Sequence, residues 1–309
     1  MNVNIKSEFV SDILRQEISD MVYRQFIIAF PHPYNKIGDG PEGPETAKVA
    51  DSLRRGMENK VLMSINLLEE AKHEGLDEIV LPKKIVRVES RGKKILFTLE
   101  DGVIIANELK MTGSWSKTST KHSKFSFILD TGEEFFFICI RKWAKTYVLF
   151  TQKQKDAYFL RVGPDILRNV IPKEEWAERY RRMTKKRKGS KPYLICDALL
   201  EQPIFSGIGN YLRADILYQA KIRPDKPTQE LTDDEYERLR LAAHDLIRKS
   251  YKARGFSMRN YRDVDGTEGV YNTLVYNQEM CPLGHKVLRS RFNGKWPKRS
   301  MYWVPQVQK

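Results

Sequence analysis

The segment 202–224 reads QPIFSGIGNYLRADILYQAKIRP, and its pattern decides the fold of the second half of the chain. Gly207 and Gly209 permit a tight backbone turn, and Asn210 follows at the start of an amphipathic helix expected over 211–220. Free backbone N–H groups at a helix start bind anions, and an Asn side chain adds a donor. Two helices joined by such a turn predict a helix–turn–helix-like clamp on a phosphate. A plain glycine turn with Asn210 as the helix N-cap is the competing interpretation.

Upstream of this segment, from about residue 80 to residue 150, short β-branched and aromatic runs replace the helical pattern. Asp101-Gly102 and Thr131-Gly132 stand between such runs at hairpin-like turns. The expected strands are 85–88, 94–100, 103–106, 125–130, 133–140 and 146–150. An antiparallel sandwich or barrel follows from this arrangement.

Helical periodicity marks the segments 41–57, 193–201 and 233–252, while 179–191 is strongly basic and is expected to be an exposed linker. The tail 286–309 holds seven basic residues and no acidic one. Its Asn293-Gly294 lies between apolar pairs and predicts a basic β-hairpin.

These patterns predict an α+β fold. An antiparallel β-sandwich with a flanking helix comes first, and a helical domain with a C-terminal hairpin follows. The expected divisions are an N-terminal extension at 1–40 with a helix near 10–28, a β-sandwich domain at 41–160, a basic hinge at 161–192, a helical DNA-binding domain at 193–275 and a hairpin at 276–309.

Composition narrows the class of protein. The 309 residues carry a formal net charge of +14, which favours nucleic acid as a partner. The three cysteines are far apart and odd in number, so no disulfide framework is implied and an intracellular location is expected, nuclear in a eukaryote and otherwise cytoplasmic. No apolar run reaches the length of a membrane span, so no membrane partner is expected.

Several segments together resemble the formamidopyrimidine-DNA glycosylase/endonuclease VIII family. The segment around Asn210 is similar to the family's helix–two-turn–helix, whose Asn binds phosphates beside the lesion. The other matching segments, in the family's order, are PEGPE (41–45), SRGKKILFTL (90–99), LKMTGSW (109–115), KHSKFSFILDTG (121–132) and RSMYWVPQVQK (299–309). The resemblance covers about residues 41–309.

The resemblance implies a catalytic role for four residues. Pro41 matches the N-terminal proline that attacks C1′ of the deoxyribose, and its adduct becomes an iminium that leads to β- and δ-elimination. Glu42 would be the adjacent acid/base carboxylate, and Glu45 would support it. Lys93 would hold the lesion's phosphate and assist proton transfer. The alternative is structural: turn prolines, helix N-terminal carboxylates and a solvated turn lysine.

A flipped nucleotide leaves a hole in the duplex that side chains must fill. By resemblance these are Met111, Arg141 and Trp143, although the residues around Arg141 depart from the family's usual Asp-Pro-Arg-Arg-Phe-Gly. A plain core role for Met111 and Trp143 stays open. Arg299 would be the finger arginine that reaches a phosphate at the lesion, or one more solvated charge.

The residues of the C-terminal tail indicate whether the chain binds a structural zinc ion. Many members build this finger on four zinc-ligating cysteines, but here only Cys281 is present, with Gly284, Val304 and Val307 at the other positions. His285 is adjacent, yet a structural zinc needs four ligands. The resemblance therefore implies a zincless finger, no metal and no cofactor.

The sequence departs from the family's pattern in the chemistry of Pro41. Gly40 precedes Pro41, and the nitrogen of an internal proline is a tertiary amide that cannot act as a nucleophile. Three hypotheses follow. The extension 1–40 is removed by proteolysis, or it is an artefact of the gene model. Alternatively the protein is catalytically altered: either Lys93 is a weaker substitute amine, or the protein only binds DNA.

The function expected first is a bifunctional DNA glycosylase/AP lyase of base excision repair. It would act as a monomer on double-stranded DNA that contains oxidised bases or abasic sites. A damaged-DNA-binding protein with a blocked amine is the second hypothesis. A general basic RNA- or DNA-binding protein is the third, and all three predict steep salt dependence.

Overall fold

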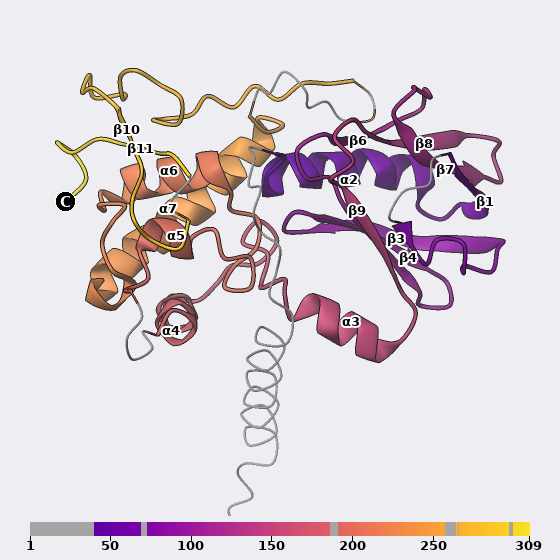
Figure 1. The fold of residues 1–309 in the computed structure, drawn as a ribbon, viewed down its shortest axis with the longest axis horizontal. Helices are drawn as coiled ribbons and strands as arrows, with labels where there is room; N and C mark the ends of the chain where they lie inside the picture. Colours follow the sequence, from indigo (N-terminus) through magenta and orange to yellow (C-terminus); the bar gives the residue numbers. More distant parts are fainter. Residues whose placement is uncertain (1–39, 69–72, 186–190, 257–263, 265, 297–298) are drawn as a thin grey trace, which may run out of the picture. The chain divides into compact units, whose positions relative to one another are not determined.

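The computed structural model describes residues 40–68, 73–185, 191–256, 264, 266–296 and 299–309 (Figure 1). The helix expected near 10–28 lies outside the described residues. Two large hydrophobic cores organise the described chain, one among the strands and one among the helices, and a small third cluster contains Leu96, Ala106 and Leu149.

Nine strands form the first core. They are β1 (Val61–Leu67), β2 (His73–Glu74), β3 (Lys83–Arg91), β4 (Lys94–Leu99), β5 (Ile104–Glu108), β6 (Gly113–Ser116), β7 (Ser123–Leu129), β8 (Glu134–Cys139) and β9 (Lys145–Leu149). Neighbouring strands follow the order β2-β9-β5-β4-β3-β1-β7-β8-β6, and every pair is antiparallel except β2 with β9. Side chains from both halves of this order share one hydrophobic core, so the strands form a sandwich.

Aromatic side chains fill this sandwich. The ring of Phe97 on β4 contacts Trp115 on β6 and Phe127 on β7, with centroids 5.4 Å apart in both cases. Such tilted and edge-on pairs add to the stabilisation from burial alone. The helix α2 (Gly43–Met57) packs against β3 and β4 and adds Leu53 and Met57 to the same core.

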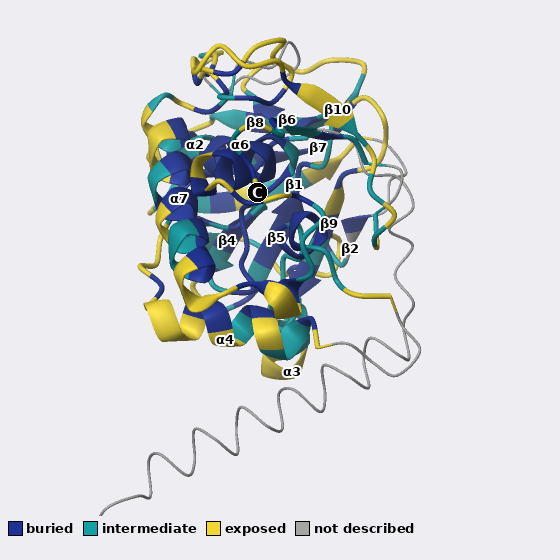
Figure 2. Cartoon of the chain, turned by 90° about the vertical axis from the view of Figure 1, so that its left-hand side faces the viewer, coloured by how far each residue is buried: buried dark blue, intermediate teal, exposed yellow. Residues whose placement is uncertain are grey.

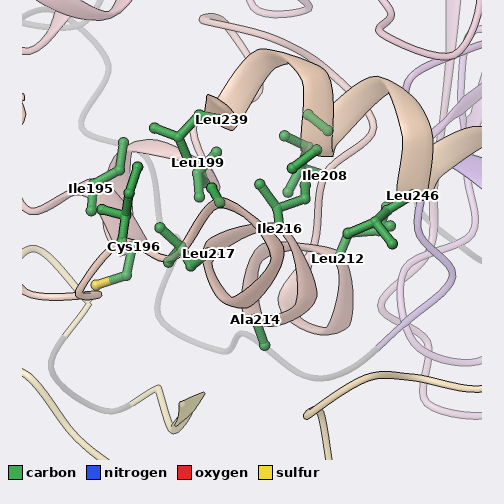
Figure 3. Packing of buried hydrophobic residues seen from close by; sticks show 14 of the residues in the cluster. Ile195, Cys196, Leu199, Ile208, Leu212, Ala214, Ile216, Leu217, Leu239 and Leu246 are labelled. Atoms are coloured by element: carbon green, nitrogen blue, oxygen red, sulfur yellow. The ribbon is translucent and has the colours of Figure 1, made fainter. Parts of the chain in front are cut away.

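The second core is helical. Its elements are α4 (Lys173–Met183), α5 (Ile195–Ala198), α6 (Asn210–Ala220), the 3-10 turn η1 (Thr228–Glu230) and α7 (Asp233–Lys252). Figure 3 shows α6 between its neighbours, with Ile216 and Leu217 among Ile195, Leu199 and Leu239. Almost all of α6 is buried (Figure 2), so the expectation of an amphipathic helix is wrong, and Gln219 is its exposed residue.

The C-terminal hairpin consists of β10 (Leu288–Ser290) and β11 (Met301–Trp303), paired antiparallel with Leu288 opposite Trp303. The chain between the two strands is a long excursion rather than a two-residue turn at Asn293-Gly294. Met301 and Val304 are buried in the helical core and fix the hairpin to it.

The structure differs from the sequence-based expectation in several elements. The strands β1 and β2 lie before residue 80, where the strand pattern was expected to begin. The basic segment expected as a linker includes part of α4, since Trp176 and Tyr180 of this helix are buried in the helical core. The helix α3 (Gln152–Phe159) follows β9 where no helix was expected, capped by Thr151. The helix expected over 193–201 is shorter and is limited to α5. In the part of the chain that the structure describes, no helix is long and apolar enough to cross a membrane.

Candidate active site

Lys93 lies in the tight turn between β3 and β4. Gly92 takes a positive φ of +57° there, and its N–H donates to Asp165 Oδ2 at 2.8 Å. A Cβ on Gly92 would come within 2.6 Å of Ser206 Oγ, so the turn lies against the loop before α6. The sandwich thus presents Lys93 to the helical part of the molecule.

Glu42 comes from the opposite side, as the residue directly before α2. The Gly43 N–H donates to the Gly207 carbonyl oxygen at 2.8 Å, which joins the start of α2 to the glycine turn. Gly207 has a φ of +110°, and Gln202 braces the turn by accepting from its N–H and donating to the Ile208 carbonyl. The sequence predicted the glycine turn but not its close approach to Gly43, where a Cβ would come within 2.9 Å of Gly207 Cα.

The carboxylate of Glu42 occupies the N-terminus of α6. Its oxygens accept N–H bonds from Gly209 at 2.7 Å, Tyr211 at 2.9 Å and Leu212 at 3.3 Å. A helix N-terminus carries partial positive charge and unpaired N–H groups, so it stabilises an anion. The expectation that these N–H groups are free for a phosphate is therefore wrong, because an internal carboxylate already binds them. Gly209, and not Asn210, is the N-cap residue.

Glu45 is fully buried and supports this arrangement. It accepts the Glu42 N–H at 2.8 Å, the Tyr211 hydroxyl at 2.8 Å and the Phe256 N–H at 2.6 Å. The Tyr211 hydroxyl also lies 2.9 Å from Ser250 Oγ on α7. One buried carboxylate thereby joins α2, α6 and the end of α7.

Burial sets the electrostatics of the site. It raises the pKa of Glu42 to about 8, with the Lys93 charge and the N–H donors opposing the shift. Burial also lowers the pKa of Lys93 to about 8, opposed by the charge of Glu42. The two shifts bring the pKa values of the carboxyl and the amine toward each other, which suits acid/base chemistry.

Gly209 leaves the space in which these groups meet. A Cβ at this position would come within 2.3 Å of Glu42 Cδ and 2.5 Å of Lys93 Nζ. A side chain at this position would have to displace the carboxylate or the amine.

Pro41 is buried beside Glu42, and the residue before it lies against the β5–β6 loop. A Cβ on Gly40 would come within 2.2 Å of the Lys110 carbonyl oxygen and 3.1 Å of Met111 Cα. The Pro41 end of α2 therefore adjoins the loop that carries Met111.

Met111, Arg141 and Trp143 come together on the β5–β6 and β8–β9 loops. Arg141 Nη1 lies 3.6 Å from Met111 Sδ, and its guanidinium carbon lies 5.5 Å from the Trp143 ring centroid. Trp143 is 40% exposed and Met111 is partly exposed. These exposures exclude the plain core role that the sequence left open.

Arg299 and Asn210 are the other two residues for which the resemblance implies DNA binding. The positive charge of Arg299 adds to the lowering of the pKa of the Lys93 amine, after the larger effect of burial. Asn210 opens α6, and its Oδ1 atom is buried without a hydrogen-bond partner among the described residues.

Metal ligation has no support in the described chain. No group of three or more His, Cys, Asp or Glu side chains there could hold a metal ion. Cys281 is buried, and its backbone N–H donates to the His285 carbonyl oxygen in the tight turn between them.

Sequence reasoning missed the roles of Tyr211 and Asp165. Both make their contacts with residues far away along the chain, and no local pattern indicates such pairs. The only signal for Tyr211 is its place directly after Asn210 at the helix start.

The comparisons with known proteins agree with this geometry. Family models match the chain for the formamidopyrimidine-DNA glycosylase N-terminal domain at 40–146 and the formamidopyrimidine-DNA glycosylase H2TH domain at 163–261. Formamidopyrimidine-DNA glycosylase of Mycoplasmopsis pulmonis is 27% identical over 286 residues, covering 87% of this chain and 98% of that protein. The enzyme of the same name from Desulfitobacterium hafniense is 29% identical, covering 82% of this chain and 96% of its own length.

Solved structures of formamidopyrimidine-DNA glycosylases have a similar fold. The MutM (Fpg) protein of Thermus thermophilus superposes with a TM-score of 0.76 at 25% identity, covering 87% of this chain and 98% of that chain. Lactococcus lactis Fpg, solved in complex with DNA that contains an abasic site, has a TM-score of 0.74 at 23% identity, covering 87% of this chain and 99% of that chain.

The two family models and the curated relatives define a DNA glycosylase of base excision repair. The chain belongs to the formamidopyrimidine-DNA glycosylase/endonuclease VIII family. The expected α+β fold is confirmed.

Proposed function

We propose that this protein is a bifunctional DNA glycosylase/AP lyase that removes oxidised bases and then cuts the strand. The observation that supports the proposal is the proximity of the Lys93 amine to the buried carboxylate of Glu42, which directly follows Pro41 in the chain. Two groups that titrate near neutral pH can move the protons that both steps require.

The proposed reaction uses the secondary amine of Pro41. Its nitrogen forms a bond to C1′ of the deoxyribose while the bond from C1′ to the base breaks, and the base leaves with a proton. Opening of the sugar ring gives an iminium, which makes the C2′ proton acidic. Loss of that proton expels the 3′ phosphate, and a second elimination expels the 5′ phosphate.

Glu42 and Lys93 have separate tasks in this proposal. Glu42 exchanges protons at the sugar, because it lies next to Pro41 in the chain and its pKa is raised to about 8. Lys93 and Arg299 bind the phosphate of the lesion, and Lys93 also assists proton transfer. Asn210 would bind a neighbouring phosphate from the start of α6.

The cluster of Met111, Arg141 and Trp143 would enter the duplex where the nucleotide leaves. Its members touch one another on two adjacent loops and remain partly exposed. An apolar wedge beside a guanidinium suits the space between stacked bases. The protein would act as a monomer with a zincless finger.

This chemistry requires a free amine. The Pro41 nitrogen is acylated by Gly40 in the 309-residue chain, so the catalytic form must begin at Pro41. An α-amino group then has a pKa of roughly 7.7–8.0 and is partly unprotonated at neutral pH.

Borohydride trapping tests the proposal. Protein that begins at Pro41 is mixed with abasic-site DNA and borohydride, and the adduct is mapped by peptide mass. A covalent adduct at Pro41 is expected. Absence of any adduct with this form, while it still binds the DNA, contradicts the proposed lyase chemistry.

The acylated nitrogen favours one second candidate: a damaged-DNA-binding protein without turnover. It predicts that no form of the chain yields an adduct, while affinity for abasic DNA exceeds that for intact DNA. An adduct mapped to Lys93 in the 309-residue form would instead identify the substitute amine.

A further inference from the structure

The chain that leads into Arg299 has almost no regular secondary structure to hold it. The strands β10 and β11 have three residues each, and Asn293 to Trp296 lie in neither. A guanidinium that acts on a phosphate must nevertheless be held in place, because loss of position costs binding and rate. Something outside the hairpin has to supply that order.

Asp197 on α5 supplies it at one end. This side chain is 3% exposed, and its Oδ2 accepts the Lys295 N–H at 2.6 Å and the Trp296 N–H at 3.4 Å. A Cβ on Gly294 would come within 2.1 Å of the same oxygen, so the turn presses directly on the carboxylate. A buried carboxylate is stable only when such donors surround it.

Arg213 on α6 supplies it at the other end. This side chain is 1% exposed, and its Nη2 donates to the Ser300 carbonyl oxygen at 2.9 Å. Its Nη1 donates to the Cys196 carbonyl oxygen at 3.1 Å, which ties it to the helix that carries Asp197. The Arg213 charge also lies close enough to lower the pKa of Asp197 against the effect of burial.

Arg299 lies between the two attachments. Its N–H donates to the Trp296 carbonyl oxygen at 3.0 Å, and Ser300 follows it directly. Backbone groups on both sides of Arg299 are thus bound by buried charges from the helical core.

We propose that Asp197 and Arg213 form a polar clamp that positions Arg299 at the lesion site. Both are positioning residues, and neither touches the substrate. This inference rests on the proposed phosphate-binding role of Arg299. It goes beyond that role, because it assigns the order of the finger to two side chains of the helical domain.

A double-mutant cycle tests the clamp on protein that begins at Pro41, with DNA that contains a tetrahydrofuran abasic analogue. Asp197→Ala is expected to weaken binding about 5- to 20-fold in the otherwise unchanged protein. In an Arg299→Ala background the same change is expected to alter binding less than about 2-fold, because the positioned group is gone. Asp197→Asn, which keeps an acceptor oxygen, should restore most of the affinity.

Glu201→Ala is the matched control. Glu201 pairs with the Lys295 side chain at 2.7 Å, so this variant alters the same turn without removing the backbone attachment. Binding within about 2-fold of the starting protein is expected, as for other exposed pairs. An equal loss from Asp197→Ala in the Arg299→Ala background and in the starting protein would overturn the clamp.

Hydrogen exchange separates this inference from the proposed function. The Lys295 amide should exchange slowly in the starting protein and in Asp197→Asn, and faster in Asp197→Ala, with or without DNA. Fast exchange of this amide in the starting protein would overturn the clamp. If Arg299→Ala binds as well as the starting protein while the amide is protected, the phosphate role of Arg299 fails and the clamp stands.

Discussion

Two opposing effects act on the ionisation of Glu42. Burial disfavours its charged form, while three N–H groups at the start of α6 favour it. The balance leaves the pKa at about 8, against an ordinary value of 4.5. A carboxyl with this pKa can give and take a proton at neutral pH.

The pH dependence of stability follows from this shift. Because the folded pKa of Glu42 is above the unfolded one, its contribution is fully present below about pH 4.5 and is lost as the pH rises through about 8. Glu42→Gln removes this titration, so its stability should fall less than that of the unchanged protein between pH 4.5 and 8. Removing Glu42 also removes a charge that raises the pKa of Lys93, which acts in the same direction.

Thermal unfolding of both proteins across that pH range measures the difference. Nicking of abasic DNA by Glu42→Gln should fall about 100-fold or more at every pH, the usual loss when an acid/base group is removed. If the unfolding temperatures of the two proteins changed in parallel with pH, the raised pKa of Glu42 would be contradicted.

Gly209 should be as sensitive as the catalytic groups. Gly209→Ala would place a methyl group against Glu42 and Lys93, and a displacement of about 1 Å lowers the rate about 100-fold. The control is Gly132→Ala, whose Cβ meets no atom within 4 Å but whose φ of +78° is strained for alanine. It should cost about 1–2 kcal/mol of stability with an unchanged rate of nicking. Equal rates for the two variants in single-turnover assays would count against the geometry of the site.

At the scale of elements, the site is a joint between α2, α6 and α7. The Tyr211 hydroxyl lies between Glu45 and Ser250, and all three side chains are buried. Such a bridge stabilises the arrangement only while every member has a partner.

Removing the hydroxyl tests the joint. Tyr211→Phe leaves the buried Glu45 carboxylate with one donor fewer, and it should lower the free energy of unfolding by about 1–2 kcal/mol. Ser250→Ala should cost less, because the bond from Tyr211 to Glu45 remains. Denaturant unfolding of the two variants gives the values, and a neutral Tyr211→Phe would show that the bridge contributes nothing.

Local patterns predicted some elements well. The helix α7 covers 233–252 as expected, because Thr232 and Glu235 form a capping box at its start. The strands β4 and β5 also match the expected runs. The strands β10 and β11 lie near the apolar pairs of the predicted hairpin, but the predicted two-residue turn at Asn293-Gly294 is wrong. In each case residues within the element carry the information.

Other elements were out of reach of local patterns. Seven of the eleven residues of α4 are charged, and only its packing through Trp176 and Tyr180 makes it part of the helical core. Glu42, Glu45 and Lys93 were found by resemblance. The contact of Glu42 with α6 joins residues more than 160 positions apart, which no periodicity indicates.

At the scale of the whole molecule, charge should govern association with DNA. The net charge of +14 predicts that affinity falls steeply with salt, by about 1,000-fold between 50 and 200 mM for roughly six phosphate contacts. Arg299→Ala should reduce the slope of log affinity against log salt by about 1. Fluorescence anisotropy at several salt concentrations gives both slopes, and identical slopes would exclude a phosphate contact by Arg299.

The account depends on a secondary amine at Pro41, and the rate of strand nicking tests it most directly. Protein that begins at Pro41 and the intact 309-residue chain are compared on the same abasic-site duplex, with intact mass confirming both N-termini after the reaction. Nicking by the Pro41 form and none by the 309-residue form is expected. Equal rates for the two forms would contradict the account, because an acylated proline nitrogen cannot form the intermediate.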